Sequence, residues 1–189
     1  MVRRPVDTNS SEEFSGTRKI SPVPDSYPRR RAPGSDWVYV KLFGGKFGAD
    51  SLLVTKILPL ACRAQVNGWA KRWFFIHFDK PDWHLRIRFH GEPKSLQENL
   101  LPALFTALEQ DVSSGRVWRV QFDTYEREVE RYGGVAGMEL SEQIFHFDSE
   151  AVAALLHEFW DEVSVFKSEV RFYLALLGCD RLLDDLGYD

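Results

Sequence analysis

The chain has 189 residues, a length that suits one domain with its own hydrophobic core. Hydrophobic residues make up 44% and charged residues 28%, as in ordinary globular proteins, and the net charge of −4 argues against nucleic acid as a direct partner. No apolar run approaches the roughly 18 residues of a membrane span, and no signal peptide follows the first methionine. The two cysteines, Cys62 and Cys179, are far apart, which is typical of a reduced bacterial cytoplasm.

The first 35 residues differ in composition from the rest. They contain five of the nine prolines and seven basic against four acidic residues, whereas the remainder is acidic. Because they show almost no aliphatic pattern, we expect a disordered tail or linker over residues 1–35 and an α+β domain over 36–189. The basic stretch YPRRRAPGS is alternatively a docking patch for an anionic partner.

The elements of the domain alternate in type. Strands are predicted at 37–43, 72–79, 83–90 and 116–125, where β-branched and aromatic residues are concentrated. Helices are predicted at 51–67 and 95–112, because their apolar residues recur with helical spacing. Asp50 is the expected N-cap of the first helix, and Pro59 and Pro102 are expected to distort the two helices.

The order β-α-β-β-α-β is typical of the ferredoxin-like arrangement. It predicts an antiparallel sheet in spatial order 4-1-3-2, with both helices on one face and the third strand inside. Further helices are expected at 138–147, from Asp148 or Ser149 onward, and at 163–177.

The third strand, WHLRIRFH, alternates apolar with basic or titratable residues. This period places His84, Arg86, Arg88 and His90 on one face. The turn DKPD is expected to pair His77 with His84, which would put Trp73, Phe75 and His77 on the arginine face and Phe74, Ile76 and Phe78 against the helices. The same alternation adds Trp37, Tyr39, Lys41 and Phe43 from the first strand, and Arg119, Gln121 and Asp123 from the fourth.

Aromatic and cationic side chains on one sheet face suggest a cover. The cover could be another part of the chain, a second copy of the chain or a bound chain. The alternative is a face exposed to solvent, on which the arginines form ion pairs. We predict no metal site, because His84 and His90 would lie about 20 Å apart and no third ligand accompanies His77 and His84. No phosphate-binding loop or nucleophile elbow indicates a cofactor.

Three stretches together resemble one family: WVYVKLFGG, WFFIHFDKPDWHLRIRFHG, and YEREVERYGG followed by MELSEQIFHFDSEAV. They are similar to the glutamate-elimination domain at the C-terminus of class I lantibiotic dehydratases, which also occurs in stand-alone thiopeptide-type bacteriocin biosynthesis proteins. The resemblance implies a lyase that expels glutamate from a glutamylated Ser or Thr of a precursor peptide, leaving dehydroalanine or dehydrobutyrine. A separate tRNA-dependent enzyme or domain would supply the glutamyl group.

The resemblance also implies a set of site residues. The family's paired arginines correspond to Arg86 and Arg88, and the Glu and Arg of its ExxRYGG motif correspond to Glu128 and Arg131, which could instead form an exposed ion pair. His84, His77, Tyr39 and Lys41 are the expected substrate-binding residues. A family histidine implicated in elimination lies in a later part of the family domain, and no residue of this chain is assigned to it.

Two other functions remain open from the sequence. One is the related cycloaddition that forms a pyridine from two dehydroalanines in thiopeptides. The other is a non-catalytic module that binds a precursor peptide or a modifying enzyme.

Overall fold

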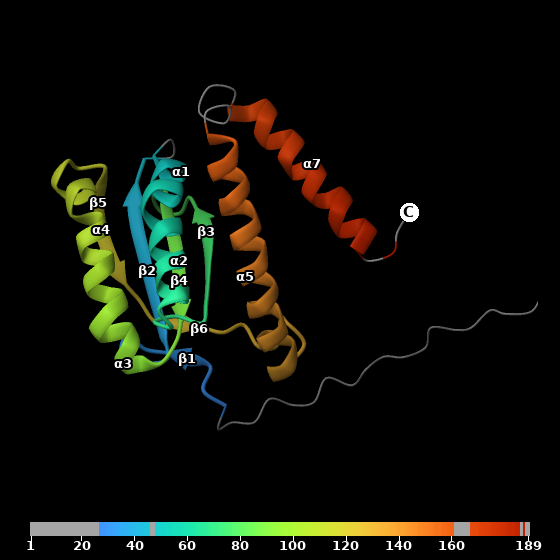
Figure 1. Ribbon diagram of the computed structural model, residues 1–189. Coiled ribbons are helices and arrows are strands. Elements are labelled where there is room, and N and C mark those ends of the chain that lie inside the picture. The colour runs from blue at the N-terminus through green and yellow to red at the C-terminus, as the bar shows by residue number, and fades with distance from the viewer. Residues whose placement is uncertain (1–26, 46–47, 161–166, 186, 188–189) are drawn as a thin grey trace, which may run out of the picture.

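The computed structural model describes residues 27–45, 48–160, 167–185 and 187. Its main sheet contains β2 (Trp37–Gly44), β3 (Arg72–Phe78), β4 (His84–His90) and β5 (Val117–Phe122), all antiparallel, in the order β3-β4-β2-β5 (Figure 1). The α+β class and the predicted strand order are therefore confirmed. The arginine-bearing strand β4 lies inside the sheet, where both its edges are hydrogen-bonded.

Two helical segments contribute to the main core beside this sheet. The first comprises α1 (Ala49–Leu52), the π-helical η1 (Leu53–Ile57) and α2 (Leu58–Val66); the second comprises α3 (Pro93–Ser95), the π-helical η2 (Leu96–Leu100) and α4 (Leu101–Ser113). Each π segment ends just before a proline, Pro59 or Pro102, which lacks the N–H of a regular helical bond. The predicted irregularities are confirmed, but the N-cap residue is Gly48, and Asp50 lies within the first turn.

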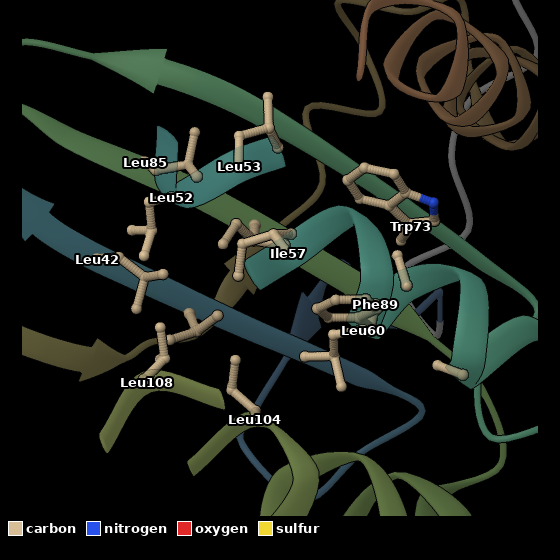
Figure 2. Packing of buried hydrophobic residues seen from close by; sticks show 14 of the residues in the cluster. Leu42, Leu52, Leu53, Ile57, Leu60, Trp73, Leu85, Phe89, Leu104 and Leu108 are labelled. Carbon is tan, nitrogen blue, oxygen red and sulfur yellow. The ribbon is translucent and has the colours of Figure 1, made fainter. Parts of the chain in front are cut away.

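The main core lies between these helices and one face of the sheet (Figure 2). Leu42, Leu85, Phe89 and Trp73 come from the strands and meet the leucines of both helical segments. Ile57, Leu53 and Leu104 are fully buried there. Burying such side chains contributes roughly 1.5–3 kcal/mol each, so this core holds the sheet in place.

The pairing of β3 with β4 differs from the prediction by one residue. Phe78, not His77, lies opposite His84, because residues 79–83 form a five-residue connection. A one-residue shift exchanges the faces of a strand. Trp73, Phe75 and His77 therefore face the helices, and Phe74, Ile76 and Phe78 share the arginine face.

A second, smaller core covers part of the arginine face. β1 (Arg30–Arg31) pairs with β6 (Tyr125–Glu126), so residues 27–35 belong to the domain, whereas residues 1–26 of the expected tail lie outside the described residues. The predicted fourth strand is correspondingly split between β5 and β6. This second core buries Trp37, Tyr39, Phe74, Tyr125, Val129 and Met138. The expectation of a covered face is confirmed for Trp37 and Tyr39, and the cover comes from the same chain.

α5 (Val135–Glu158) runs along the outer edge of β3 as one helix, where two were expected (Figure 1). Ser149, expected as a possible cap, lies inside this helix, and its hydroxyl accepts a hydrogen bond from Phe75 N at 3.1 Å. α7 (Lys167–Asp185) follows and extends beyond the predicted end at residue 177. In the described part of the chain, no helix is long and apolar enough to cross a membrane.

Candidate functional site

The row of alternating residues on β4 crosses two environments. Arg88 and His90 lie under the second core, which we call the covered half of the arginine face. Lys41, His84, Arg86 and Arg119 lie beyond it, and we call this region the open half. Tyr39 pairs with Arg88 and Lys41 with Arg86, so both halves continue onto β2.

Arg88 is a buried cation surrounded by aromatic rings. Arg88 is only 8% exposed. Its guanidinium carbon lies 4.2 Å from the ring centre of Tyr39, 4.7 Å from that of Tyr125 and 5.2 Å from that of Phe74. Nε and Nη1 have no hydrogen-bond partner among the described residues. Burial lowers the pKa of Arg88. Such a guanidinium can donate strong hydrogen bonds to an anion that enters from outside.

Arg88 lines a small pocket with a volume of about 80 Å³. Glu128 lines the same pocket, as do Glu126 and the aromatic residues Tyr125, Tyr132 and Phe145. The structure therefore brings together a cation and a carboxylate that the sequence placed 40 positions apart. A cation and a carboxylate at one small, partly apolar cavity are the ingredients of proton abstraction next to a carbonyl group.

Arg131 lies outside this pocket lining. Its Nη1 donates to Glu128 Oε2 at 2.7 Å, and both side chains are largely exposed. The ion pair that the sequence left as an alternative is thus present. Glu128 lines the pocket, whereas Arg131 does not.

Arg86 occupies the open half and is bonded to His84. Its Nε donates to His84 Nε2 at 2.9 Å, while His84 Nδ1 donates to the carbonyl of Asp82 at 2.7 Å. These two bonds define a neutral His84 that is protonated on Nδ1. Burial, followed by the charges of Arg86, Lys41 and Arg119, lowers the pKa of His84, and the bond to Asp82 opposes this effect.

His77 does not join the other predicted substrate-binding residues. It faces the helices because of the shifted register, and its Nε2 lies 3.6 Å from Asp50 Oδ1. Burial lowers the pKa of His77. Tyr39, Lys41 and His84, by contrast, share the arginine face as expected; Lys41 is ion-paired with Asp123 and lies 5.3 Å from the Tyr39 ring centre.

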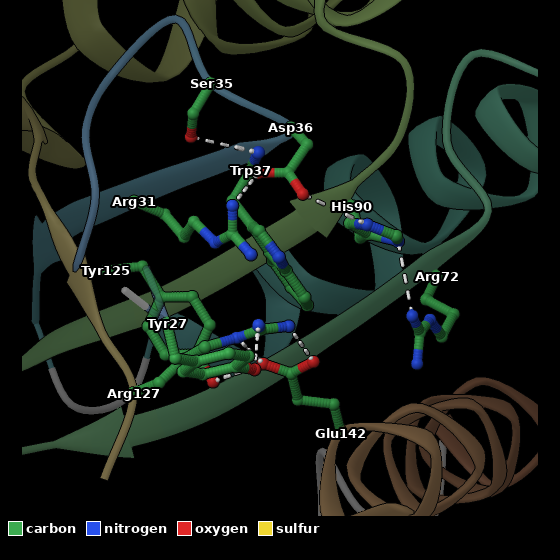
Figure 3. Close-up of polar contacts among 10 residues, drawn as sticks. All are labelled: Tyr27, Arg31, Ser35, Asp36, Trp37, Arg72, His90, Tyr125, Arg127 and Glu142. Atoms are coloured by element: carbon green, nitrogen blue, oxygen red, sulfur yellow. Dashed lines mark hydrogen bonds and ion pairs between the residues drawn. The ribbon is translucent and has the colours of Figure 1, made fainter. Parts of the chain in front are cut away.

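A buried charge network that the sequence did not reveal supports the covered half (Figure 3). Arg127 Nε and Nη2 donate to the two carboxylate oxygens of Glu142 at 2.7 and 2.6 Å, and Nη1 donates to the Tyr27 hydroxyl at 2.6 Å. Tyr125 donates to Glu142 at 3.1 Å. Both Arg127 and Glu142 lie in the stretches that carry the family resemblance, but neither strand alternation nor helical spacing marks them as partners.

Residues 37–189 match the family model described as "Lantibiotic biosynthesis dehydratase C-term". The chain belongs to this family. Subtilin biosynthesis protein SpaB of Bacillus subtilis is 32% identical over 128 residues, and nisin biosynthesis protein NisB of Lactococcus lactis subsp. lactis is 27% identical over 128 residues. Each match covers 68% of this chain and 12% of the relative, so the chain spans only a small part of these proteins.

Two solved structures are also similar to this chain. The tRNA-dependent lantibiotic dehydratase MibB from Microbispora sp. 107891 superposes with a TM-score of 0.61 and 35% sequence identity, over 67% of this chain and 12% of MibB. TsrL superposes with a TM-score of 0.50 and 20% identity, over 65% of this chain and 35% of TsrL, which shows a shared fold.

Proposed function

We propose that this lantibiotic dehydratase domain is a lyase that eliminates glutamate from glutamylated Ser or Thr residues of a precursor peptide. The observation that carries the proposal is the buried guanidinium of Arg88. Two of its nitrogens, Nε and Nη1, lack hydrogen-bond partners among the described residues, and it lines a pocket together with Glu128. Such a cation is costly to bury unless an anion completes it. The enolate and the leaving carboxylate of a β-elimination are anions of this kind.

The chemical step follows from the residues at the pocket. Glu128 takes the proton from the α-carbon of the modified residue, and Arg88 stabilises the negative charge that spreads onto the neighbouring carbonyl oxygen. The electron pair then forms the Cα–Cβ double bond, the Cβ–O bond breaks, and glutamate leaves as a carboxylate near Arg86. Arg131 orients Glu128 through their ion pair.

The peptide lies across the arginine face in this proposal. Tyr39, His84 and Lys41 contact the substrate beside Arg86, since they occupy the same face of β2 and β4. The partners are a bacterial precursor peptide and a glutamylating enzyme or domain that is distinct from this chain, and the reaction takes place in the cytoplasm. The step uses neither a metal nor an organic cofactor.

Mass spectrometry of a chemically glutamylated precursor peptide tests the proposal. Loss of glutamate in the presence of the chain is the expected result. Arg86→Lys and Arg88→Lys keep the charge but lose the planar fork, so the glutamylated peptide should persist at least about 10²-fold longer.

Arg63→Lys is the matched control, because Arg63 is also an arginine stacked on an aromatic ring, that of Trp69, but on α2. It should eliminate glutamate at the parent rate. Equal rates for all three variants would reject the roles of Arg86 and Arg88. Release of a macrocycle with leader peptide would instead indicate the cycloaddition, and an unchanged mass with measurable peptide binding would indicate a binding module.

A further inference from the structure

The open half of the arginine face carries more positive than negative charge. Lys41, Arg86 and Arg119 gather there around His84, and Asp123 is the acidic residue paired with Lys41. The hydrogen bond from Lys41 lowers the pKa of Asp123, and the positive charge of Arg86 lowers it further. Lys41 and Arg86 therefore share one carboxylate and Arg119 adds a third positive charge, which leaves a surplus that an anionic ligand can neutralise.

Arg119 has no role in the reaction proposed above. Its guanidinium carbon lies 3.7 Å from the ring centre of Phe43 and 4.9 Å from that of Trp118, and it forms no ion pair among the described residues. A guanidinium that lies flat on a ring keeps the N–H groups at its edge free for a carboxylate. The Trp118 side chain, which is 54% exposed, places an accessible aromatic ring beside Arg119.

The strand register places Arg119 close to the reacting residues. Phe43 pairs with His84 on one side and with Arg119 on the other, so these three residues form one row across the sheet. Lys41 pairs in the same way with Arg86 and Gln121. Arg119 also contributes to the lowered pKa of His84, the residue to which Arg86 is bonded.

We propose that the open half is a dicarboxylate site and that, in the proposed reaction, it binds the departing glutamate. Arg119 binds the side-chain carboxylate, and Arg86 binds the carboxylate that is released when the Cβ–O bond breaks. Asp123 lies where it can attract the amino group of glutamate. Glutamate carries two carboxylates and one ammonium group after cleavage, which complements an Arg86–Arg119 pair next to one acid.

This assignment rests on the proposed function for the identity of the ligand, but the site itself can be tested without the reaction. Before cleavage the glutamyl group has one free carboxylate, and elimination creates the second. Arg86 on β4 and Arg119 on β5 lie on either side of β2. Together they therefore interact more strongly with the leaving glutamate than with the bound ester, which favours the transition state. Removing Arg119 should weaken both substrate recognition and stabilisation of the departing anion.

Binding of glutarate is the direct experiment. Glutarate, L-glutamate and L-glutamine are titrated into the chain while the indole N–H signal of Trp118 is followed by NMR, after assignment by its loss in Trp118→Phe. We expect saturable shifts with glutarate and glutamate, and at least tenfold weaker binding of glutamine. Arg119→Gln should weaken glutarate binding at least tenfold, and Arg63→Gln, the stacked arginine on α2, should not change it.

The elimination assay separates the site from the reaction. A parent chain that eliminates glutamate, with an Arg119→Gln variant that has a raised KM and weakened glutarate binding, would support both proposals. Elimination together with unchanged glutarate binding in Arg119→Gln would overturn the site and leave the proposed function intact. Arg119-dependent glutarate binding in a chain that does not eliminate glutamate would overturn the function and leave a dicarboxylate site.

Discussion

Arg88 places a positive charge where the surrounding side chains are mostly aromatic. Three ring contacts within 5.2 Å stabilise it, each worth roughly 0.5–2 kcal/mol. Against them stands an effective desolvation penalty of several kcal/mol for a buried ion. The two effects are similar in size, so the residue contributes little net stability. Its conformation is nevertheless well defined, because the rings fix the plane of the guanidinium.

We therefore expect Arg88→Met to leave the free energy of unfolding unchanged within about 1 kcal/mol, or to raise it, while elimination falls at least about 10²-fold. Urea unfolding and the mass assay measure the two quantities on the same preparation. A loss of more than about 3 kcal/mol would show instead that Arg88 mainly holds the second core together.

His90 makes stability depend on pH. Burial, followed by the charge of Arg72, lowers its pKa to about 4, although Asp36 Oδ2 lies 3.6 Å from its Nε2 and opposes this effect. The unfolded chain protonates this histidine near pH 6.5, so between these values the unfolded state binds more protons. Stability contributed by His90 is then present above pH 6.5 and is lost as the pH falls toward 4.

Urea unfolding of the parent chain and of His90→Asn at pH 7, 5.5 and 4.5 tests this expectation. The parent should lose about 2 kcal/mol more than the variant across the range. If the free energy of unfolding changes equally in the parent and in His90→Asn from pH 7 to 4.5, the pKa of His90 is the same in the folded and the unfolded state.

At the scale of elements, the Arg127–Glu142 pair joins the segment after β6 to α5. Both side chains are almost completely buried, and the bonds are bidentate. Removing one member of a buried pair leaves the other charge without a partner, which usually costs 3–5 kcal/mol. The same carboxylate accepts the Tyr125 hydroxyl, and the Tyr125 ring lies beside Arg88.

Glu142→Gln should accordingly destabilise the chain by about 3 kcal/mol in urea unfolding. Glu139→Gln, an exposed change on the same helix, should stay within about 0.5 kcal/mol. The double variant Arg127→Met with Glu142→Leu should lose less than the single change, because no unpaired charge remains. A Glu142→Gln variant as stable as Glu139→Gln would contradict the assignment of a structural ion pair.

The sequence predicted most elements and the sheet order, because the strands and the two core helices have clear periodicity. It misplaced β3, whose residues 73–78 are apolar or aromatic on both faces apart from His77, so alternation could not show which face is inside. The five-residue connection after Phe78 then decided the register. The predicted break inside α5 is also wrong. Asp148 and Ser149 suit the start of a helix, but the Ser149 hydroxyl instead accepts a hydrogen bond from a backbone N–H on the edge of β3.

The candidate site was predicted in part. Alternation along β4 correctly placed His84, Arg86, Arg88 and His90 on one face, since the apolar residues of that strand all lie on the other face. It could not show that Arg88 is enclosed and Arg86 is not, because the enclosing residues come from β6 and α5. Long-range pairs such as Arg127 with Glu142 leave no periodic signal, and only the folded chain reveals them.

For the molecule as a whole, the boundary of the domain lies earlier than the composition indicated. Residues 27–35 add one strand pairing and several polar contacts to the second core: Arg30 and Arg31 pair with β6, Arg31 lies 3.3 Å from Asp36, and the Tyr27 hydroxyl accepts from Arg127. Arg127 would lose one of its buried partners without Tyr27. The segment therefore supports the side of the sheet on which Arg88 lies.

Two truncated chains, 27–189 and 36–189, measure this contribution. The longer one should match the parent in melting temperature, as the composition of residues 1–26 predicts. The shorter one should lose about 2–3 kcal/mol, because an unsatisfied buried donor on Arg127 costs roughly 1–3 kcal/mol and the β1–β6 hydrogen bonds disappear as well. Hydrogen exchange should show the loss concentrated in β6 and the first turns of α5, with the helix-covered core unchanged. If both truncated chains have the same melting temperature, the β1–β6 pairing does not stabilise the fold, and β6 and α5 alone enclose Arg88.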